Sequence, residues 1–378
     1  MVELAETAID QREPVSKTAP RASVVQTETM KAVYFEEFAV LPVLREVPEP
    51  LLSAAGVIVR IEATGLCRSD WHGWRGHDPD IALPHVPGHE LVGAIDAVGP
   101  LVRRFRVGQR VTVPFVCACG ECPECDAGNG QVCRNQTQPG FTHWGSYAER
   151  VALHNADVNL IAIPDDLDAG AAALLGCRFA TSYRGLVHQA RLLAGETLVV
   201  VGCGGVGLSA VMIGQALGAI VIAVDINSDA LEAASRVGAA HVVNSAGLPD
   251  DEVVERIRAL TLDGAQVSLE ALGRENTVAI GIRSLATRGR HVQIGLLADD
   301  PRMPLGTVIA RELTVLGSHG MPAHDYPALL DLVLSGGLRP QDLINRRITL
   351  AEVPAALAAM STPGAPAGVT LIEVTRPL

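Results

Sequence analysis

Residues 197–225 read TLVVVGCGGVGLSAVMIGQALGAIVIAVD. This stretch begins as a β-branched, strand-like run, turns through four closely spaced glycines, continues as an uncharged helix-like segment, and ends in a second strand-like run. A strand, a glycine-rich turn and a helix in this order let the backbone approach a pyrophosphate at the helix N-terminus. The sequence therefore predicts a dinucleotide-binding loop formed by Gly202, Gly204, Gly205, Val206 and Gly207.

Asp225 closes the second strand of this stretch. A carboxylate at that position can accept hydrogen bonds from the hydroxyls of an adenosine ribose, and it repels a 2′-phosphate. The bland alternative is a glycine-rich turn that binds nothing. The strand, the glycines and the acidic residue follow one another at the expected spacing, which favours a dinucleotide site. The carboxylate of Asp225 favours NAD over NADP as the ligand.

The same alternation of elements extends over residues 179–318. Strand-like runs at 197–201, 220–224, 241–243, 267–269, 291–294 and 313–316 alternate with helix-like runs at 206–217, 229–237, 250–260 and 276–286. Alternation of this kind is typical of a parallel sheet covered on both faces. The predicted fold class is α/β, with a doubly wound parallel sheet in residues 179–318.

The segments that flank residues 179–318 have a different sequence pattern. Residues 30–178 contain short strand-like runs at 31–35, 56–63 and 110–114, broken by Gly and Pro, which indicates an irregular β domain. Residues 319–378 contain a helix-like run at 326–334 and a strand-like run at 369–374, and we expect them to return to the first domain. Residues 1–29 have no apolar core of the kind that a signal peptide needs, and they are expected to form a disordered extension.

Composition excludes several classes of protein. The 378 residues carry 30 Lys and Arg against 42 Asp and Glu, a formal charge of −12, which repels nucleic acid and anionic membranes. Residues 197–224 are uncharged, but their glycine cluster fits a strand, turn and buried helix rather than a membrane span. Eight cysteines in a long chain without a secretory signal indicate thiols kept as metal ligands in a reducing, cytoplasmic compartment.

Two groups of metal-ligating residues stand out. The segment C-G-E-C-P-E-C-D-A-G-N-G-Q-V-C places Cys119, Cys122, Cys125 and Cys133 in one short lobe, where four thiolates can surround a structural zinc ion. A second set, Cys67, His89 and Cys177, would leave a fourth position open, as catalytic zinc requires. These three residues are far apart in the sequence, and two buried cysteines with a surface histidine remain the alternative.

With these motifs in order, residues 30–378 resemble the zinc-containing alcohol dehydrogenases of the medium-chain dehydrogenase/reductase superfamily. The resemblance implies a chaperonin-like β domain that carries two zinc ions and a Rossmann domain that binds NAD, with the active site in the cleft between them. Cys67, His89 and Cys177 fall on the catalytic-zinc positions, and Glu90 follows the histidine as either a transient ligand or a nearby anion. The implied reaction is hydride transfer from an alcohol to the nicotinamide.

The resemblance also assigns roles around the metal. It implies that Ser69 and His72 relay the alcohol proton to solvent and that Asp70 supports the zinc-ligating imidazole. Arg68 is implied to contact the cofactor pyrophosphate, and Thr181 to lie near the nicotinamide. The predicted aromatic lining of the substrate pocket is Trp71, Trp74 and Phe115, which favours primary or small secondary alcohols.

Some features depart from the family pattern or leave alternatives open. Around residues 366–370 the chain reads P-A-G-V-T, where the family often has a basic residue that reaches the cofactor phosphates. Cys117 and Cys203 are assigned to no metal. Polyol dehydrogenases of the superfamily commonly lack a cysteine at the position of Cys177, which disfavours a polyol substrate. A polyol or formaldehyde-type dehydrogenase and a non-catalytic NAD-binding sensor remain alternatives, and the expected assembly is a homo-oligomer, a tetramer rather than a dimer.

Overall fold

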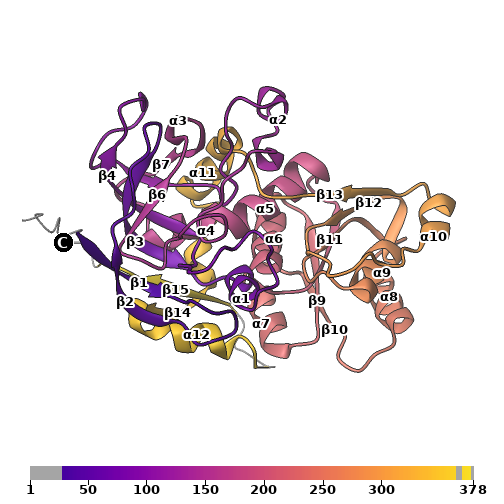
Figure 1. Cartoon of the computed structure of the whole chain (residues 1–378). Helices are drawn as coiled ribbons and strands as arrows, with labels where there is room; N and C mark the ends of the chain where they lie inside the picture. Colours follow the sequence, from indigo (N-terminus) through magenta and orange to yellow (C-terminus); the bar gives the residue numbers. More distant parts are fainter. Residues whose placement is uncertain (1–27, 363–367, 376–378) are drawn as a thin grey trace, which may run out of the picture.

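Two large β-sheets organise the chain in the computed structural model, which describes residues 28–362 and 368–375 (Figure 1). One sheet has six strands in the order β10-β9-β8-β11-β12-β13, and every neighbouring pair is parallel. Its strands are β8 (Thr197–Val201), β9 (Ile220–Asp225), β10 (His241–Asn244), β11 (Ala265–Glu270), β12 (Leu285–Gln293) and β13 (Thr314–Gly317). Its helices are α6 (Gly205–Ala216), α7 (Ser228–Arg236), α8 (Asp250–Ala259), α9 (Glu275–Arg283) and α10 (Leu305–Ala310).

The residues of β8 alternate between two hydrophobic cores. Leu198 and Val200 pack with the apolar face of α6, whereas Val199 and Val201 pack with side chains of α8 and α9. Because successive strand residues point to opposite faces, both faces of this sheet are covered. The predicted doubly wound α/β fold is confirmed, and residues 197–225 form β8, α6 and β9.

One boundary prediction is wrong. The predicted helix at 276–286 ends earlier, at Arg283, and β12 begins at Leu285. Leu285 and Ala286 suit an apolar helix by composition, but Leu285 pairs with Ala265 of β11 and is fully buried in the sheet. Tertiary packing therefore overrides the local helical pattern here.

The second sheet is mixed, in the order β14-β15-β3-β4-β5-β7, with β6 paired to β3. Its C-terminal strand β15 runs antiparallel to β3 with Leu371 opposite Gly65, so the end of the chain packs on the first segment. The sheet is built from β3 (Val57–Gly65), β4 (Leu91–Val98), β5 (Arg110–Thr112), β6 (Arg150–Leu153), β7 (Ile161–Ala162), β14 (Ile344–Thr349) and β15 (Val369–Glu373). A separate two-stranded sheet pairs β1 (Thr29–Tyr34) with β2 (Val43–Pro48).

Short helices complete this part of the chain. They are α1 (Arg68–Trp74), α2 (Pro123–Asp126), η1 (Gly130–Val132), α3 (Ala156–Asn159), η4 (Ala323–Asp325), α11 (Tyr326–Leu334), η5 (Pro340–Leu343), η6 (Leu350–Glu352) and α12 (Val353–Ala359). The predicted extension 1–29 lies outside the described residues up to residue 27, and Thr29 already belongs to β1. Across the described ranges, no helix has both the length and the apolar character needed to cross a membrane.

A continuous helical run connects the two sheets. It comprises α4 (Ala169–Leu174), η2 (Leu175–Phe179), α5 (Ala180–Tyr183) and η3 (Arg184–Gln189), in which η2 and η3 are π-helical turns. The predicted domain boundary at residue 178 falls inside this run. Figure 1 shows α5 beside α6, and the two helices are in contact. Because π-helical turns often occur at functional sites, η2 directs attention to Cys177.

Candidate active site

Cys67, His89 and Cys177 meet although they come from three separate segments. Cys67 caps the N-terminus of α1, His89 lies in the loop before β4, and Cys177 lies on the turn η2. Their ligand atoms and a carboxylate oxygen of Glu90 all lie within 4.8 Å of one another. Nε2 of His89 is buried and has no hydrogen-bond partner among the described residues. Two sulfurs and one unpartnered imidazole nitrogen fit a zinc ion with one open coordination position.

Electrostatics inside the cluster favour a thiolate. A hydrogen bond from Cys177, reinforced by His89, outweighs burial and holds the pKa of Cys67 well below its ordinary value. Burial disfavours a charged imidazole, but the neighbouring carboxylate of Asp70 raises the pKa of His89 well above its ordinary value. Since zinc binds the deprotonated ligands, loading of this site releases protons.

Asp70 connects the ligand-bearing segments. Its Oδ1 accepts hydrogen bonds from Nδ1 of His89 at 3.0 Å and from the backbone N–H of Gly88 at 3.1 Å. Its Oδ2 accepts from the hydroxyl of Tyr147 at 2.6 Å and from the backbone N–H of Cys67 at 3.0 Å. This carboxylate therefore fixes the imidazole tautomer that leaves Nε2 free for a metal.

Glu90 is held by Arg178, a residue that the sequence reasoning did not identify. Nε of Arg178 donates to both carboxylate oxygens of Glu90 at 2.9 Å, and Nη2 donates to one of them and to the backbone carbonyl of Leu66. Both side chains are buried, with exposed fractions of 4% for Arg178 and 0% for Glu90. The Glu90 carboxylate thus lies beside the metal ligands but is already paired with a cation.

The four cysteines of the lobe at 119–133 surround one point. Neighbouring sulfur atoms are separated by 3.4 to 3.9 Å. A tetrahedral zinc with Zn–S bonds of ~2.3 Å requires sulfur separations of about 3.8 Å. Backbone amides of Gly120 and Asn135 donate to Cys125 and Cys133 at 3.4 and 3.3 Å, which stabilises thiolates. The donor set therefore fits a closed zinc site.

The glycine loop after β8 makes room for a ligand. Gly202 has a φ of +95°, which favours glycine, and a Cβ on Gly207 would lie 1.7 Å from the carbonyl oxygen of Gly202. A Cβ on Gly204 would meet no atom within 4 Å, so open space lies above this residue. Because Gly204 caps α6, the first N–H groups of the helix point toward that space, which suits a phosphate.

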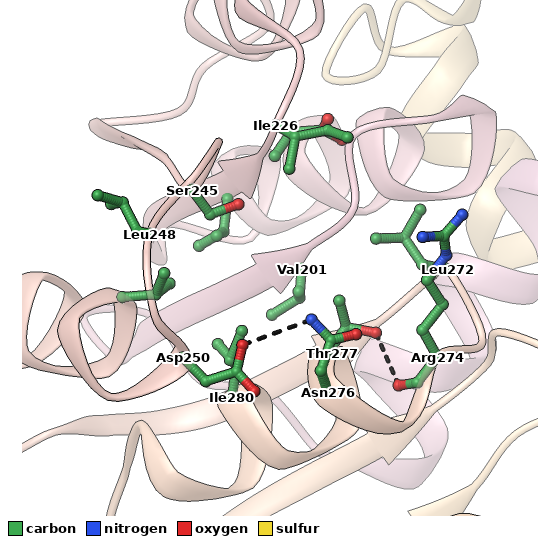
Figure 2. A pocket seen from close by; sticks show the side chains of 13 residues that line it. Val201, Ile226, Ser245, Leu248, Asp250, Leu272, Arg274, Asn276, Thr277 and Ile280 are labelled. Atoms are coloured by element: carbon green, nitrogen blue, oxygen red, sulfur yellow. Dashed lines mark hydrogen bonds between the residues drawn. The ribbon is translucent and has the colours of Figure 1, made fainter. Parts of the chain in front are cut away.

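A hollow of about 120 Å³ lies at the carboxyl ends of β8, β9 and β11. Figure 2 shows Ser245 and Leu248 on one side of the hollow, Leu272 and Arg274 on the other, and Ile226 at the top. Asp225 lines the hollow and accepts hydrogen bonds from the backbone N–H groups of Cys203 at 2.7 Å and Asn227 at 2.9 Å. The other lining residues are Val201, Val224, Asp250, Val253, Asn276, Thr277 and Ile280. A slot with apolar walls, and with the Asp225 carboxylate at the end of β9, fits an adenosine group.

Of the two residues predicted to relay a proton, Ser69 lies next to Cys67 and His72 contacts His77. The hydroxyl oxygen of Ser69 is 3.6 Å from the sulfur of Cys67. Nδ1 of His72 is 2.9 Å from Nδ1 of His77, and burial, followed by the positive charge of Arg68, lowers the pKa of His72 below its ordinary value. The side chain of Thr181 is buried, and its hydroxyl has no partner among the described residues.

Aromatic rings surround the imidazole of His89. The ring of Phe115, a predicted pocket residue, lies 6.2 Å from that of His89 and 5.3 Å from that of His319. Phe141, which the sequence reasoning missed, lies 5.1 Å from His89. His319 also lines a second hollow of about 340 Å³, bounded by residues 131–132 of the cysteine lobe and by residues 293–297, which begin at the last residue of β12.

The structure places the two tryptophans of α1 differently. Trp71 stacks under the guanidinium of Arg68 at 4.2 Å, and its indole N–H donates to Ser361 at 2.7 Å. Trp74 is 5% exposed, belongs to the core beneath α1 and α12, and donates to the backbone carbonyl of Val40. The predicted pocket role of Trp74 is therefore wrong, because its ring is used in packing.

Comparison with known proteins agrees with this geometry. Residues 53–165 match the family described as alcohol dehydrogenase GroES-like domain, and residues 205–335 match the family described as zinc-binding dehydrogenase. An alcohol dehydrogenase of Geobacillus stearothermophilus is 34% identical over 313 residues, which cover 82% of this chain and 90% of the relative. An L-threonine 3-dehydrogenase of Streptomyces coelicolor is 30% identical over 324 residues, 83% of this chain and 91% of the relative.

Solved structures give the same result. An alcohol dehydrogenase from Thermus sp. ATN1 superimposes with a TM-score of 0.83 at 31% identity, covering 92% of this chain and 100% of the other. A putative zinc-binding dehydrogenase from Sinorhizobium meliloti 1021, solved bound to NADP, gives a TM-score of 0.82 at 31% identity and covers 92% and 99% of the two chains. By its two matched domains and these full-length relatives, the chain belongs to the zinc-containing alcohol dehydrogenases of the medium-chain dehydrogenase/reductase superfamily and is a nicotinamide-dependent oxidoreductase.

Proposed function

We propose that this enzyme catalyses the reversible oxidation of primary or small secondary alcohols to aldehydes or ketones, with NAD as the hydride acceptor. The observation that carries the proposal is the meeting of Cys67, His89 and Cys177 with one imidazole nitrogen unpartnered. A zinc ion bound there would lower the pKa of a substrate hydroxyl, and the nicotinamide would accept the hydride. A protein that only sensed NAD would have no need for this open ligand set.

The chain's own residues then have separate tasks. Ser69, next to Cys67, accepts the alcohol proton while its own hydroxyl proton moves on. His72 passes a proton toward solvent because its lowered pKa keeps the imidazole neutral and able to accept one. Phe115 and Phe141 form apolar walls beside His89 and exclude water from the reacting atoms. Thr181 offers its unpartnered hydroxyl to the nicotinamide end of the cofactor.

Preference for NAD rests on Asp225. Its carboxylate lines the adenosine hollow, where it would bind the ribose hydroxyls and repel a 2′-phosphate. The Sinorhizobium meliloti relative was solved with NADP, so the preference is a property to be measured for this chain. The four-cysteine lobe is proposed to hold a second zinc ion, giving two per subunit.

The assembly is proposed to be a homo-oligomer, a tetramer rather than a dimer. Edge strand β13 leaves Val315 39% exposed, and the neighbouring helix α10 exposes Leu305 at 59% and Ile309 at 78%. Apolar side chains beside an unpaired sheet edge suit contact with a second copy of the chain. None of the eight cysteines, all of which lie in the described part of the chain, forms a disulfide, which supports a cytoplasmic location.

A substrate panel with the zinc-loaded enzyme tests the proposal. It contains simple primary and secondary alcohols, a polyol, L-threonine and glutathione-bound formaldehyde, each measured with NAD and NADP. We expect the simple alcohols with NAD to give the highest kcat/KM. Cys67→Ser should abolish turnover and keep NADH binding, whereas Cys117→Ser, a buried cysteine outside both ligand sets, should keep both. Turnover that survives in Cys67→Ser would exclude the catalytic assignment.

A further inference from the structure

Arg178 reaches from the metal ligands to the glycine loop. Nε and Nη2 of its guanidinium bond Glu90, while Nη1 points to the first turn of α6. A Cβ built on Gly205, the first residue of that helix, would lie 2.5 Å from Nη1 and 3.2 Å from the central guanidinium carbon. Gly205 is therefore required in order to admit the arginine side chain against the helix backbone.

The remaining donors of this guanidinium are unused. Arginine has five N–H donors, and within the described residues Nη1 of Arg178 makes no hydrogen bond. The residue as a whole is 3% exposed, and Nη1 itself is not fully enclosed, so a ligand in the space at the glycine loop can reach it. A buried charged group normally has its donors satisfied, which makes the free edge of Arg178 evidence for a missing ligand.

The position of the unbonded nitrogen, Nη1, indicates which kind of ligand would bind it. It lies at the N-terminus of a twelve-residue helix, where the first backbone N–H groups are also free of intrahelical partners. Helix amides and a guanidinium together bind a diphosphate group well, because both favour negative charge and arginine binds phosphate through several donors. Contacts between α5 and α6, including the hydrogen bond from Ser182 to the carbonyl of Val206 at 2.8 Å, hold the two elements together.

Arg68, the residue expected to contact the pyrophosphate, is engaged elsewhere in this structure. Its guanidinium stacks on Trp71, and Nη1 donates to the backbone carbonyl of Met360. Arg178, by contrast, has its charge fixed by Glu90 and its free edge already at the glycine loop. A preorganised donor costs less conformational entropy on binding than a side chain that must move.

We propose that Arg178 binds the pyrophosphate of the dinucleotide and bridges it to Glu90 beside the catalytic metal. One guanidinium then serves two sites: Nε and Nη2 hold the carboxylate, and Nη1 holds a phosphate oxygen. The cofactor and the metal ligands are thereby connected through a single buried side chain. This inference extends the proposed function but does not depend on which alcohol is oxidised.

Binding measurements without any alcohol test the inference. Calorimetry on the zinc-loaded enzyme would compare adenosine with ADP-ribose, which adds the pyrophosphate and a second ribose. Arg178→Gln should weaken ADP-ribose binding by roughly 10- to 100-fold, the loss typical of a charged hydrogen bond, and leave adenosine affinity within about twofold. Arg110→Gln is the matched control, because Arg110 is another buried arginine paired with a glutamate, Glu62, and it faces residues 164–167 instead.

A second variant separates binding from folding. Loss of Arg178 alone leaves Glu90 buried without a partner and can destabilise the protein. The double variant Arg178→Met with Glu90→Gln removes both charges, and its metal content and thermal midpoint are measured first. We expect this variant to bind adenosine normally and ADP-ribose weakly. If it binds ADP-ribose as tightly as the wild type, Arg178 has a structural role only and the inference is overturned.

Discussion

Asp70 holds His89 in place, with Oδ1 of the carboxylate accepting a hydrogen bond from Nδ1 of the imidazole at 3.0 Å. The exposed fraction is 0% for the side chain of Asp70 and 1% for that of His89, so solvent screens the pair little. The same carboxylate also receives the backbone N–H of Cys67, so it supports two of the three metal ligands. Replacing Asp70 should therefore weaken metal binding directly, and it should slow the reaction through the loss of the metal.

We therefore expect Asp70→Asn to weaken retention of the catalytic zinc by about 10- to 100-fold. The amide oxygen can still accept hydrogen bonds, but the second acceptor oxygen and the charge that stabilises the imidazole in the orientation that the metal needs are both lost. Zinc counted per subunit after dialysis against a chelator should fall from two to one. Tyr147→Phe, which removes a different donor to the same carboxylate, should keep both ions; equal losses in the two variants would show that general destabilisation is responsible.

A second prediction concerns cofactor choice. Asp225→Asn retains an acceptor for the backbone N–H of Cys203 and removes the negative charge, and Asp225→Gly removes both. Each should lower the ratio of kcat/KM for NAD to that for NADP by about 10-fold or more, because repulsion of the 2′-phosphate is relieved. Asp250→Asn is the control, since Asp250 lines the same hollow but bonds Asn276. Steady-state kinetics with both cofactors measure the ratio, and an unchanged value would remove Asp225 from this role.

Local sequence patterns are sufficient to predict much of the fold and of the candidate site. The glycine loop and the cysteine lobe are predictable because each is formed within one short segment, where spacing sets geometry. Asp225 is predictable because the carboxyl ends of adjacent parallel strands lie together, as Val201 and Val224 do here. The ligand set of Cys67, His89 and Cys177 could be named from family resemblance, and its meeting in space required the structure.

Other residues could not be assigned in this way. Arg178 looks like an ordinary arginine beside a cysteine, and its partner Glu90 is 88 positions away in the sequence. Trp71 and Trp74 are three positions apart on a helix of seven residues, too short for periodicity to show which ring faces the core. The hydroxyl of Ser361, which accepts from Trp71, and the carbonyl of Val40, which accepts from Trp74, belong to distant segments.

Proton transfer gives a third prediction, with a defined pH dependence. His72 can accept a proton only when its imidazole is neutral, that is, at a pH above its pKa. Since burial and then Arg68 lower the pKa of His72 from its ordinary value, kcat for alcohol oxidation should be maintained to a pH below ~6.5 and should fall at lower pH.

His72→Gln removes this acceptor and should reduce kcat at neutral pH by about 10-fold or more, while NADH affinity is unchanged. Added imidazole buffer should restore part of the rate. His143→Gln is the control, because His143 contacts His154 and the carbonyl of Ala152 instead. If the rate of His72→Gln equals that of the wild type across the pH range, the proton leaves by another route.

The fourth prediction separates the two metal sites through stability. The sulfur of Cys122 lies 3.4 Å from that of Cys125 and 3.6 Å from that of Cys133, so Cys122→Ser removes one corner of the tetrahedron. The lobe has few other apolar contacts, since its buried cluster consists of Ala118, Cys122 and Cys133 with Cys119 and Cys125 packed against them. Metal bonds must therefore provide most of the free energy that folds it.

Cys122→Ser should consequently lose one zinc per subunit and lower the thermal midpoint by about 5 °C or more. Cys117→Ser is a matched substitution two positions before the lobe: the residue is buried, but its sulfur lies near the carbonyl of Pro114 at 3.5 Å and belongs to no ligand set. It should keep two zinc ions and most of its thermal stability.

Metal analysis combined with calorimetry distinguishes the cases, and two zinc ions in Cys122→Ser would mean that these four sulfurs do not bind the second metal. A lobe that unfolds on losing its ion, while Cys67, His89 and Cys177 keep theirs, would show that the second metal maintains the shape of this segment and takes no part in the reaction.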